Sequence, residues 1–360
     1  MNAHRPRPGR SALLRLEPVV GVFATLGSVA LIIWMLYNGR VVLMPLAFAI
    51  VLAFVLWTAV DWLGRVPGVE STPIWVRHIV VLVIATIALL SLFFQLRLNV
   101  EVLMQRLPGY QANVLALLAR LDESLGLKDT ATGGLSAMAA ESVNVQSFAR
   151  GILSAASNIG GIVALVFLYT AFLMLEYSGI VAKLRLAFPD QEAVGRFLAL
   201  GRDVNQRIGG FLAIKTLVNI VLGVVSYGAL LWLGVDLAGF WAIVIGILNY
   251  VPYLGSAAGV ALPSLMVLAQ TGSLSLTAGS VVILSLIQFV IGAVFEPRII
   301  GQRMNLSPLV VLLSLASWYA LWGLPGAALA IPLTVIIVSL LGAVDFTRPL
   351  AVMLSNDGKV

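Results

Sequence analysis

Long apolar runs separated by short polar segments dominate this chain of 360 residues. Six of the runs are close to the roughly 20 residues that a membrane-spanning helix needs. They are Val19 to Tyr37, Val41 to Leu63, Ile74 to Leu96, Gly151 to Glu176, Gly209 to Leu233 and Leu276 to Phe295. The pattern predicts an all-α polytopic membrane protein with about six full transmembrane helices.

Two further apolar blocks are too long for one span and carry helix-breaking residues at their centres. Residues 238–270 are interrupted by NYVPYLG (249–255), and residues 309–343 by GLPG (323–326). A straight helix of about 33 residues would be about 50 Å long, against a hydrocarbon core of about 30 Å. We therefore expect two broken-helix hairpins and about eight crossings by hydropathy. Hydropathy leaves open whether each hairpin is re-entrant or crosses fully as two short helices.

Two stretches are polar enough to leave the hydrocarbon. Residues 97–150 contain a section, Val114 to Leu125, with apolar positions at helical spacing, which predicts amphipathic helices on the outer surface. Residues 177–208 contain Pro189-Asp190, which opens a charged helix that runs directly into the span near Gly209. We expect this second stretch to be a cytoplasmic lever.

Composition supports the membrane assignment and excludes several chemistries. The chain is 60% hydrophobic and only 11% charged, far from the usual soluble domain. It has no cysteine, which excludes disulfides, thiolate nucleophiles and Cys-ligated metals. The net charge of +6 is scattered over short loops rather than gathered in a stripe, so no nucleic-acid partner is predicted.

The distribution of Lys and Arg predicts the orientation, because positive charge concentrates in cytoplasmic loops. With the N-terminus inside, 15 of these residues fall on the inner side and 6 on the outer side, and Lys215 lies within a span. Residues 1–18 and 346–360 then form cytoplasmic tails, the first of them basic and disordered. The run from Val19 is too long for a signal peptide and lacks a cleavage site, so we expect a retained first span.

Four motifs in the C-terminal half are similar to the signature of the AI-2E family of transporters. They are NYVPYLG (249–255), FEPRIIG (295–301), LSPLVV (306–311) and GLPG (323–326) continuing to IPL (331–333). The resemblance implies a transporter of the bacterial inner membrane without a cofactor, in a lipid bilayer and forming homo-oligomers. Family members are described as exporters of the quorum-sensing signal autoinducer-2 or as sodium or lithium/proton antiporters. Ser256 and Gln302 depart from the usual family pattern, so the substrate stays undetermined.

The first break has the composition of a substrate site. Pro252 removes a backbone donor and Gly255 permits unusual conformations, so we expect the carbonyls near Ile247 and Leu248 to lose their helical partners. Paired broken helices are the best sequence-level indication of a transporter's binding site. The alternative is an ordinary polar hairpin tip at the membrane interface.

Glu296 follows a span and shares a helix face with Gln288. An acid at a membrane border is a candidate proton or cation carrier. The alternative is an interfacial ion pair with Arg298 or Arg303. We also expect Pro297 to end this helix and Pro308 to start the next segment.

Lys215 and Asn219 lie four residues apart on one face of the span from Gly209. Near the cytoplasmic end, Lys215 can extend to the headgroups. The alternative is a counter-charge for Glu296 or for an anionic substrate.

The candidate site residues form two groups. Those for substrate binding or gating are Asn249, Tyr250, Pro252, Tyr253, Gly255, Gln288, Ser307, Pro308, Gly323, Pro325 and Gly326. Those for ion or proton coupling are Glu296, Arg298, Lys215 and Asn219. No P-loop, zinc-protease motif or nucleophile with a base is present, so we predict neither an enzyme nor an ATP-driven pump, and no metal site.

We therefore predict a secondary transporter that exports a small polar molecule, autoinducer-2-like by resemblance, by alternating access. A core of residues 209–345 would move against a scaffold of the three spans in residues 19–96. One alternative is a sodium or lithium/proton antiporter with Glu296 as the carrier. The other is a non-transporting scaffold that binds a partner through residues 97–150.

Overall fold

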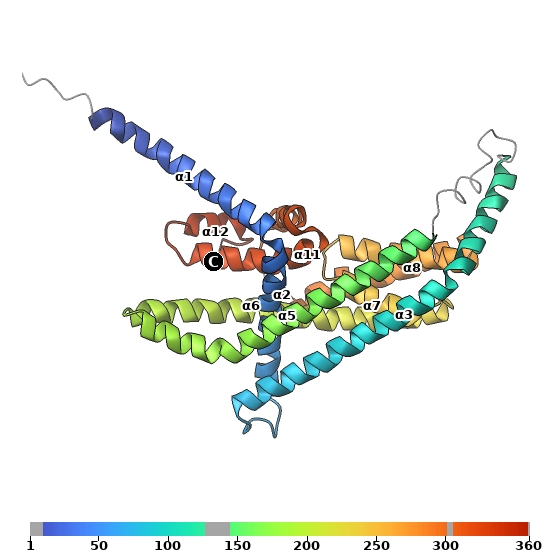
Figure 1. Ribbon diagram of the computed structural model, residues 1–360, viewed down its shortest axis with the longest axis horizontal. Coiled ribbons are helices and arrows are strands. Elements are labelled where there is room, and N and C mark those ends of the chain that lie inside the picture. The colour runs from blue at the N-terminus through green and yellow to red at the C-terminus, as the bar shows by residue number, and fades with distance from the viewer. Residues whose placement is uncertain (1–9, 127–144, 301–304, 359–360) are drawn as a thin grey trace, which may run out of the picture.

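The computed structural model describes residues 10–126, 145–300 and 305–358, and these are almost entirely helical (Figure 1). The elements are α1 (Arg10–Asn38), α2 (Arg40–Leu63), α3 (Ile74–Leu125), α5 (Val145–Ala187), α6 (Gln191–Trp232), α7 (Ala238–Leu248), α8 (Leu254–Thr271), α9 (Leu274–Phe289), the π-helical η1 (Val290–Phe295), α10 (Glu296–Ile300), α11 (Pro308–Gly342) and α12 (Arg348–Leu354).

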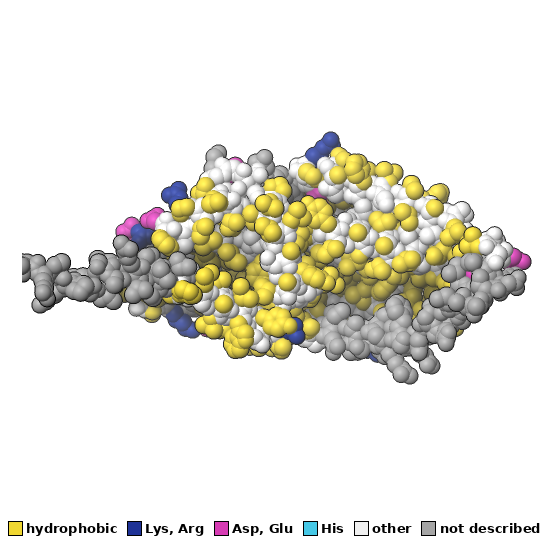
Figure 2. Space-filling view, turned by 90° about the horizontal axis from the view of Figure 1, so that it is seen from above, with side chains coloured by type: hydrophobic (Ala, Val, Ile, Leu, Met, Phe, Trp, Pro, Cys, Tyr) yellow, Lys and Arg dark blue, Asp and Glu magenta, His cyan; other side chains and the backbone are white. Residues whose placement is uncertain are grey.

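Within the described residues, six helices are long and apolar enough to cross a membrane, or seven if the bent α5 counts as one span. The six lie in α2, α3, α6, α8, the run Leu274–Ile299 and α11. Figure 2 shows hydrophobic side chains spread over one face of the molecule, with the few charged side chains mostly at its margins. The prediction of an all-α polytopic membrane fold is confirmed.

Several helix boundaries differ from the prediction. The helix α1 begins at Arg10, inside the expected disordered tail, and α3 continues to Leu125 instead of giving way to separate amphipathic helices. The helix α5, which contains the predicted fourth span, also continues past Glu176 to Ala187, with a bend of 58°. Hydropathy marks where a chain leaves the hydrocarbon, whereas a helix ends only where its backbone hydrogen bonds are interrupted.

The helix α6 joins the polar stretch to a span, as predicted. Asp190 caps it by accepting hydrogen bonds from the backbone of Glu192 and Ala193. From there the helix continues without a break to Trp232. It is the long central helix on which both broken hairpins pack (Figure 1).

Two hydrophobic clusters divide α6 between them. Its C-terminal half, from Ile214 to Leu230, packs with α7, α8, α9 and part of α3. Its N-terminal half, from Leu200 to Leu212, packs with α2 and α11. Phe211 contacts both clusters, so the boundary between them crosses α6 next to this residue.

Small residues let the neighbouring helices approach α6 closely. A Cβ atom on Gly209 would lie 2.6 Å from the carbonyl oxygen of Phe54 in α2. On Gly223 it would lie 3.2 Å from that of Ala242 in α7, and on Gly246 of α7 it would lie 3.1 Å from that of Asn219. The first hairpin therefore packs along α6 at backbone contact.

The first hairpin consists of α7 and α8, and its two ends lie side by side. Its ends are tied together because Gln270 donates to the carbonyl of Gly234 and accepts from the backbone of Asp236, each at 2.8 Å. The 11 residues of α7 extend only about 16 Å, roughly half of a hydrocarbon core. Segment 249–253 at the tip therefore lies at membrane depth.

The second hairpin is formed by α11, which breaks at Gly323 with φ 68° and ψ −149°, inside the predicted GLPG segment. Beyond it, α12 brings the chain back to the start of α11, where the backbone of Ser307 donates to Leu354 and Leu306 pairs with Ser355. The two hairpins lie toward opposite ends of α6 (Figure 1).

A polar cluster fixes the base of the first hairpin to the extension of α3. Asp236 bonds to Arg106 and accepts from the Tyr110 hydroxyl at 2.9 Å, and Asn113 donates to the carbonyl of Gln270 at 2.7 Å. The hydrogen bond from Arg106 is the main reason that the pKa of Asp236 is lowered. Burial, followed by the bond to Asp236, raises the pKa of Tyr110 to about 12.

We predict that Asp236→Asn lowers the unfolding temperature at neutral pH. A carboxyl whose pKa is lower in the folded state stabilises the fold above its unfolded pKa of about 4, and this contribution is lost as the pH falls through the folded pKa. The difference between variant and parent should therefore shrink on acidification. Thermal unfolding in detergent between pH 7 and pH 3 measures this. Asp203→Asn breaks an exposed pair with Arg207 on the same protein and should have little effect; equal effects of the two substitutions would contradict the assignment.

Candidate functional site

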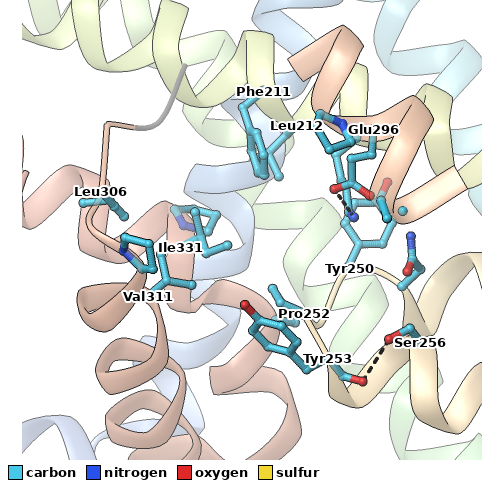
Figure 3. Close-up of a pocket in the computed structure, with 18 of the residues that line it drawn as sticks. Phe211, Leu212, Tyr250, Pro252, Tyr253, Ser256, Glu296, Leu306, Val311 and Ile331 are labelled. Atoms are coloured by element: carbon cyan, nitrogen blue, oxygen red, sulfur yellow. Dashed lines mark hydrogen bonds and ion pairs between the residues drawn. The ribbon is translucent and has the colours of Figure 1, made fainter. Parts of the chain in front are cut away.

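A cavity of about 740 Å³ lies at the boundary between the two hydrophobic clusters. Its walls come from α6, the tip of the first hairpin, the run from α9 to α10, and the start and second arm of α11 (Figure 3). Of the candidate site residues, it is lined by Lys215, Asn249, Tyr250, Pro252, Tyr253, Gln288, Glu296 and Pro308.

The tip of the first hairpin closes through its own backbone. The backbone N–H of Tyr250 donates to Ile247 at 3.2 Å, and that of Val251 donates to Leu248 at 2.9 Å. The two carbonyls do lose their helical i+4 partners, as expected, and tight i+3 turn bonds replace them.

Gly255 has a different role from the one predicted. Its φ is not in the left-handed region, but a Cβ atom there would lie 1.8 Å from the carbonyl oxygen of Leu248. Glycine is therefore needed for close packing of the two arms. The unusual conformation falls on Tyr253, with φ 61° and ψ −56°, where Leu254 donates to the carbonyl of Pro252 at 2.7 Å. This is the classic γ-turn, which is rare and strained.

Tyr253 lines the cavity at this strained turn. It is 67% exposed, and Figure 3 shows it between the hairpin tip and the apolar side chains of α11. Ser256, which departs from the family pattern, donates to the carbonyl of Tyr253 at 3.0 Å and also lines the cavity. The polar side chain thus supports the turn that presents Tyr253.

The hairpin tip is bonded to α6 by two polar contacts. Asn249 donates to the side-chain oxygen of Asn219 at 2.8 Å, and the hydroxyls of Tyr250 and Thr216 lie 2.7 Å apart. Asn219 and Asn249 are both buried. Polar side chains at membrane depth need partners, and these two contacts supply them to Asn249 and Tyr250; Nδ2 of Asn219 is buried without a partner among the described residues.

Lys215 forms an ion pair with Glu296, with Nζ and Oε1 2.5 Å apart. The side chains are 10% and 21% exposed, so the pair is largely shielded from solvent and borders the cavity. Lys215 is therefore the counter-charge of Glu296, which was one of the two alternatives, and its ammonium group does not extend to the lipid headgroups. The expected partner Arg298 is exposed, and Arg303 lies outside the described residues.

Glu296 reaches the cavity through a π-helical segment. The prediction that Pro297 ends this helix was wrong, because the helical backbone continues through it to Ile300, directly after the π-helical turn. The six π-helical residues before it shift the helix face, and Gln288 and Glu296 both line the cavity. Single π-turns of this kind are frequent at functional sites.

The second hairpin contributes its entrance rather than its break. Ser307 caps α11 by accepting from the backbone of Val310 at 3.3 Å, and Pro308 follows it into the cavity wall. The break residues Gly323, Pro325 and Gly326 do not line the cavity. A Cβ atom on Gly326 would lie 2.1 Å from the Trp318 carbonyl oxygen, so that glycine serves the packing of the break itself.

Sequence reasoning missed the apolar wall and the polar partner on α6. Leu306, Val311 and Ile331 face the polar residues across the cavity, and Phe211 and Leu212 of α6 lie on the side of Glu296 (Figure 3). Such residues are indistinguishable from core or lipid-facing residues in a sequence this apolar. Thr216 has a weak signal, since it neighbours Lys215 and precedes Asn219 on the same helix.

The arrangement suits the binding of an uncharged polar solute. One wall offers amide and hydroxyl groups and an ion pair without net charge, and the opposite wall is mostly hydrocarbon, with Asn305 and Asn356 beside it. The Nε2 of Gln288 is buried and has no hydrogen-bond partner among the described residues. In the same part of the chain, no three His, Asp or Glu side chains converge as metal ligands would.

Comparisons with known proteins match most of the chain to one family. The model of the family described as AI-2E family transporter matches residues 26–345. The chain is 30% identical to YhhT of Escherichia coli K12 over 337 residues, 91% of this chain and 90% of that protein. It is 28% identical to the AI-2 transport protein TqsA of the same organism, over 93% and 95%. A sodium-lithium/proton antiporter of Halobacillus andaensis is 30% identical over 48% of each chain.

We predict that Gly255→Ala destabilises the protein, because the added methyl overlaps the Leu248 carbonyl and the hairpin tip must open. Overpacking of this kind costs about 1–3 kcal/mol. Gly228→Ala on α6 is a matched control, since nothing lies within 4 Å of its added Cβ. Thermal unfolding in detergent should show a lower midpoint for the first variant and an unchanged midpoint for the control; an unchanged midpoint for both would disprove the close contact.

We expect Lys215→Met to lower the free energy of unfolding by about 2 kcal/mol, because Glu296 is left without its counter-charge. This is below the roughly 3–5 kcal/mol of a fully buried pair, since Glu296 stays partly exposed. Adding Glu296→Gln should restore most of the loss. Unfolding of the two single variants and the double variant tests the coupling; if the two losses simply add, the residues are not paired.

Proposed function

The chain belongs to the AI-2E transporter family, and on this premise we propose that it is a secondary transporter that exports a small polar molecule by alternating access to the cavity. It is a multi-pass membrane protein whose relatives include a protein named for AI-2 transport. The observation that carries the proposal is one cavity bounded by the tip of the first hairpin and the entrance of the second. Broken helices that meet around a cavity are the usual construction of a transporter's substrate site.

The charge distribution of the loops gives the proposed orientation, with both termini in the cytoplasm. In that orientation the first hairpin enters from the outer side and the second from the cytoplasm. The cavity is bordered by Asn305, Leu306 and Asn356, beside the cytoplasmic entrance of the second hairpin. A cavity reached from the cytoplasm is what an exporter needs for loading.

The chemistry of the cavity favours an uncharged, hydroxyl-bearing solute such as autoinducer-2. Lys215 and Glu296 cancel each other's charge, so neither an anion nor a cation is favoured while the pair is intact. Asn249, Tyr250 and Gln288 supply neutral donors and acceptors. Hydrogen-bonding groups of this kind discriminate strongly against solutes that leave them unpaired.

We assign the alternating movement to the second hairpin. The first hairpin is fixed at its base to α3 through Asn113 and along its length to α6 through Gly223 and Gly246. The second hairpin faces the cavity with apolar side chains, which can slide without breaking hydrogen bonds. Moving its entrance away from the tip of the first hairpin would change access to the cavity.

Cation/proton antiport is a second candidate function, favoured by the Lys215–Glu296 pair in the cavity wall. In this candidate function Glu296 is the carrier, and a cation would take the place of Lys215 as its counter-charge. One relative is named a sodium-lithium/proton antiporter.

Flux in proteoliposomes tests both candidates. We expect export of autoinducer-2 by the parent, and about a tenfold loss in Asn249→Leu, which corresponds to one buried hydrogen bond of roughly 1.4 kcal/mol. Arg202→Gln, at an exposed position of α6 that does not line the cavity, is the control and should transport normally. If the protein is instead an antiporter, Glu296→Gln abolishes pH-dependent sodium exchange and autoinducer-2 flux is absent. Absence of both fluxes in well-folded protein would overturn the proposed function.

A further inference from the structure

A groove of about 520 Å³ lies between α6 and α7, next to the cavity and distinct from it. Its lining residues are Leu92, Thr216, Asn219, Ile220, Gly223, Val224, Tyr227, Gly239, Ala242, Ile243, Gly246, Ile247 and Tyr250. Four of these are glycine or alanine, so the helices leave the space open. None of the candidate substrate residues except Tyr250 belongs to it.

The groove and the cavity share a thin polar partition. Tyr250 lines both spaces, and its hydroxyl meets Thr216, which lines only the groove. Asn249 lines only the cavity and donates to Asn219, which lines only the groove. The two spaces are therefore separated by two hydrogen-bonded pairs and not by packed hydrocarbon.

The groove is apolar and opens toward the bilayer. Ile220, Val224 and Ile247 are 57%, 64% and 45% exposed and belong to the membrane-embedded parts of α6 and α7. A polar solute finds almost no donor or acceptor there, whereas a hydrocarbon chain can fill the space between the small residues. The cavity on the other side of Tyr250, in contrast, has one polar wall.

We propose that the cavity and the groove form one binding site for a neutral amphiphile, with the polar head in the cavity and a short hydrocarbon chain in the groove. The inference rests on the proposed transport function and deepens it by naming the substrate class. The ion pair of Lys215 and Glu296 has no net charge, which selects an uncharged head. Tyr250 lines both spaces, so the bound molecule would pass this side chain at the point where its head joins its chain.

Seating such a molecule requires the Tyr250–Thr216 hydrogen bond to open. Tyr250 stands two residues before Pro252, at a tip that contains the strained γ-turn of Tyr253. Strain of this kind costs about 1–3 kcal/mol, so its relief would offset the loss of one hydrogen bond. The partition is thus placed on a segment that can rearrange.

Photocrosslinking tests the shared site. The probe is hexyl glucoside with a diazirine at the end of its chain, added to the full chain in lipid nanodiscs, with labelled peptides identified by mass spectrometry. We expect labelling concentrated on groove residues such as Val224, Tyr227 and Ile243. Unlabelled hexyl glucoside should suppress it at lower concentration than methyl glucoside does, by up to about fourfold for each added methylene. Labelling no stronger at the groove than on the exposed apolar face of α3, and not suppressed, would overturn the proposal.

Three variants separate a shared site from a simple lipid-filled groove. Gly239→Leu should abolish groove labelling because it fills the space, and its Cβ meets only Tyr227 at 3.8 Å, an ordinary contact. Gly228→Leu lies outside the groove and should not change it. Gln288→Leu alters only the cavity and should reduce groove labelling several-fold if head and chain belong to one ligand; unchanged labelling would mean that the groove binds hydrocarbon alone.

The outcome can be told apart from failure of the proposed function. If polar-molecule flux persists in the parent and in Gly239→Leu while groove labelling fails, only the amphiphile site is wrong. If no flux occurs in either but the labelling follows the expected pattern, the transport proposal is wrong and the binding site remains.

Discussion

The structure depends on one constraint, which is that a helix broken inside a membrane must find partners for the polar groups at its break. At the first hairpin these partners come from its own turn bonds and from α6. Within little more than one helical turn, α6 presents Lys215, Thr216 and Asn219, which meet Glu296, Tyr250 and Asn249 respectively. A single helix thus satisfies both the hairpin tip and the acid at the end of the π-helical segment.

The same helix also explains where the cavity lies. Its two halves belong to different hydrophobic clusters, and the polar positions fall next to the boundary between them. Side chains from neither cluster fill that boundary completely, which leaves a space with one polar and one apolar wall. The hairpins approach it from opposite ends of α6, the arrangement that inverted repeats produce in secondary transporters (Figure 1).

Rigidity and strain are distributed unevenly around this space. The base of the first hairpin is fixed by Arg106, Tyr110 and Asn113 of α3, and its arms are fixed by glycine-mediated backbone contacts. The tip holds a strained turn at Tyr253, and apolar contacts dominate the wall from α11. A site built from a fixed support, a strained tip and a sliding apolar wall can change its access while its polar contacts stay in place.

The sequence by itself determined the features that depend on local chemistry. Apolar runs predicted a helical membrane protein, Pro252 and Gly323 fixed where two of those runs must break, and the motifs around them identified the family. Asp190 and Pro308 even marked the starts of their helices, because a cap or a first-turn proline acts on backbone only a few positions away. Helix ends without such a marker, as in α1, α3 and α5, were misplaced.

Only the tertiary structure decided which of these features meet. It paired Glu296 with Lys215 rather than with Arg298, and it brought Pro308 rather than Gly323 to the cavity. It also supplied the apolar wall of the cavity and the groove. In a chain this apolar, hydrophobic pattern does not distinguish a residue facing lipid from one facing a cavity. That choice depends on contacts between segments far apart in the chain, such as α6 and α10, which no local rule of spacing or propensity encodes.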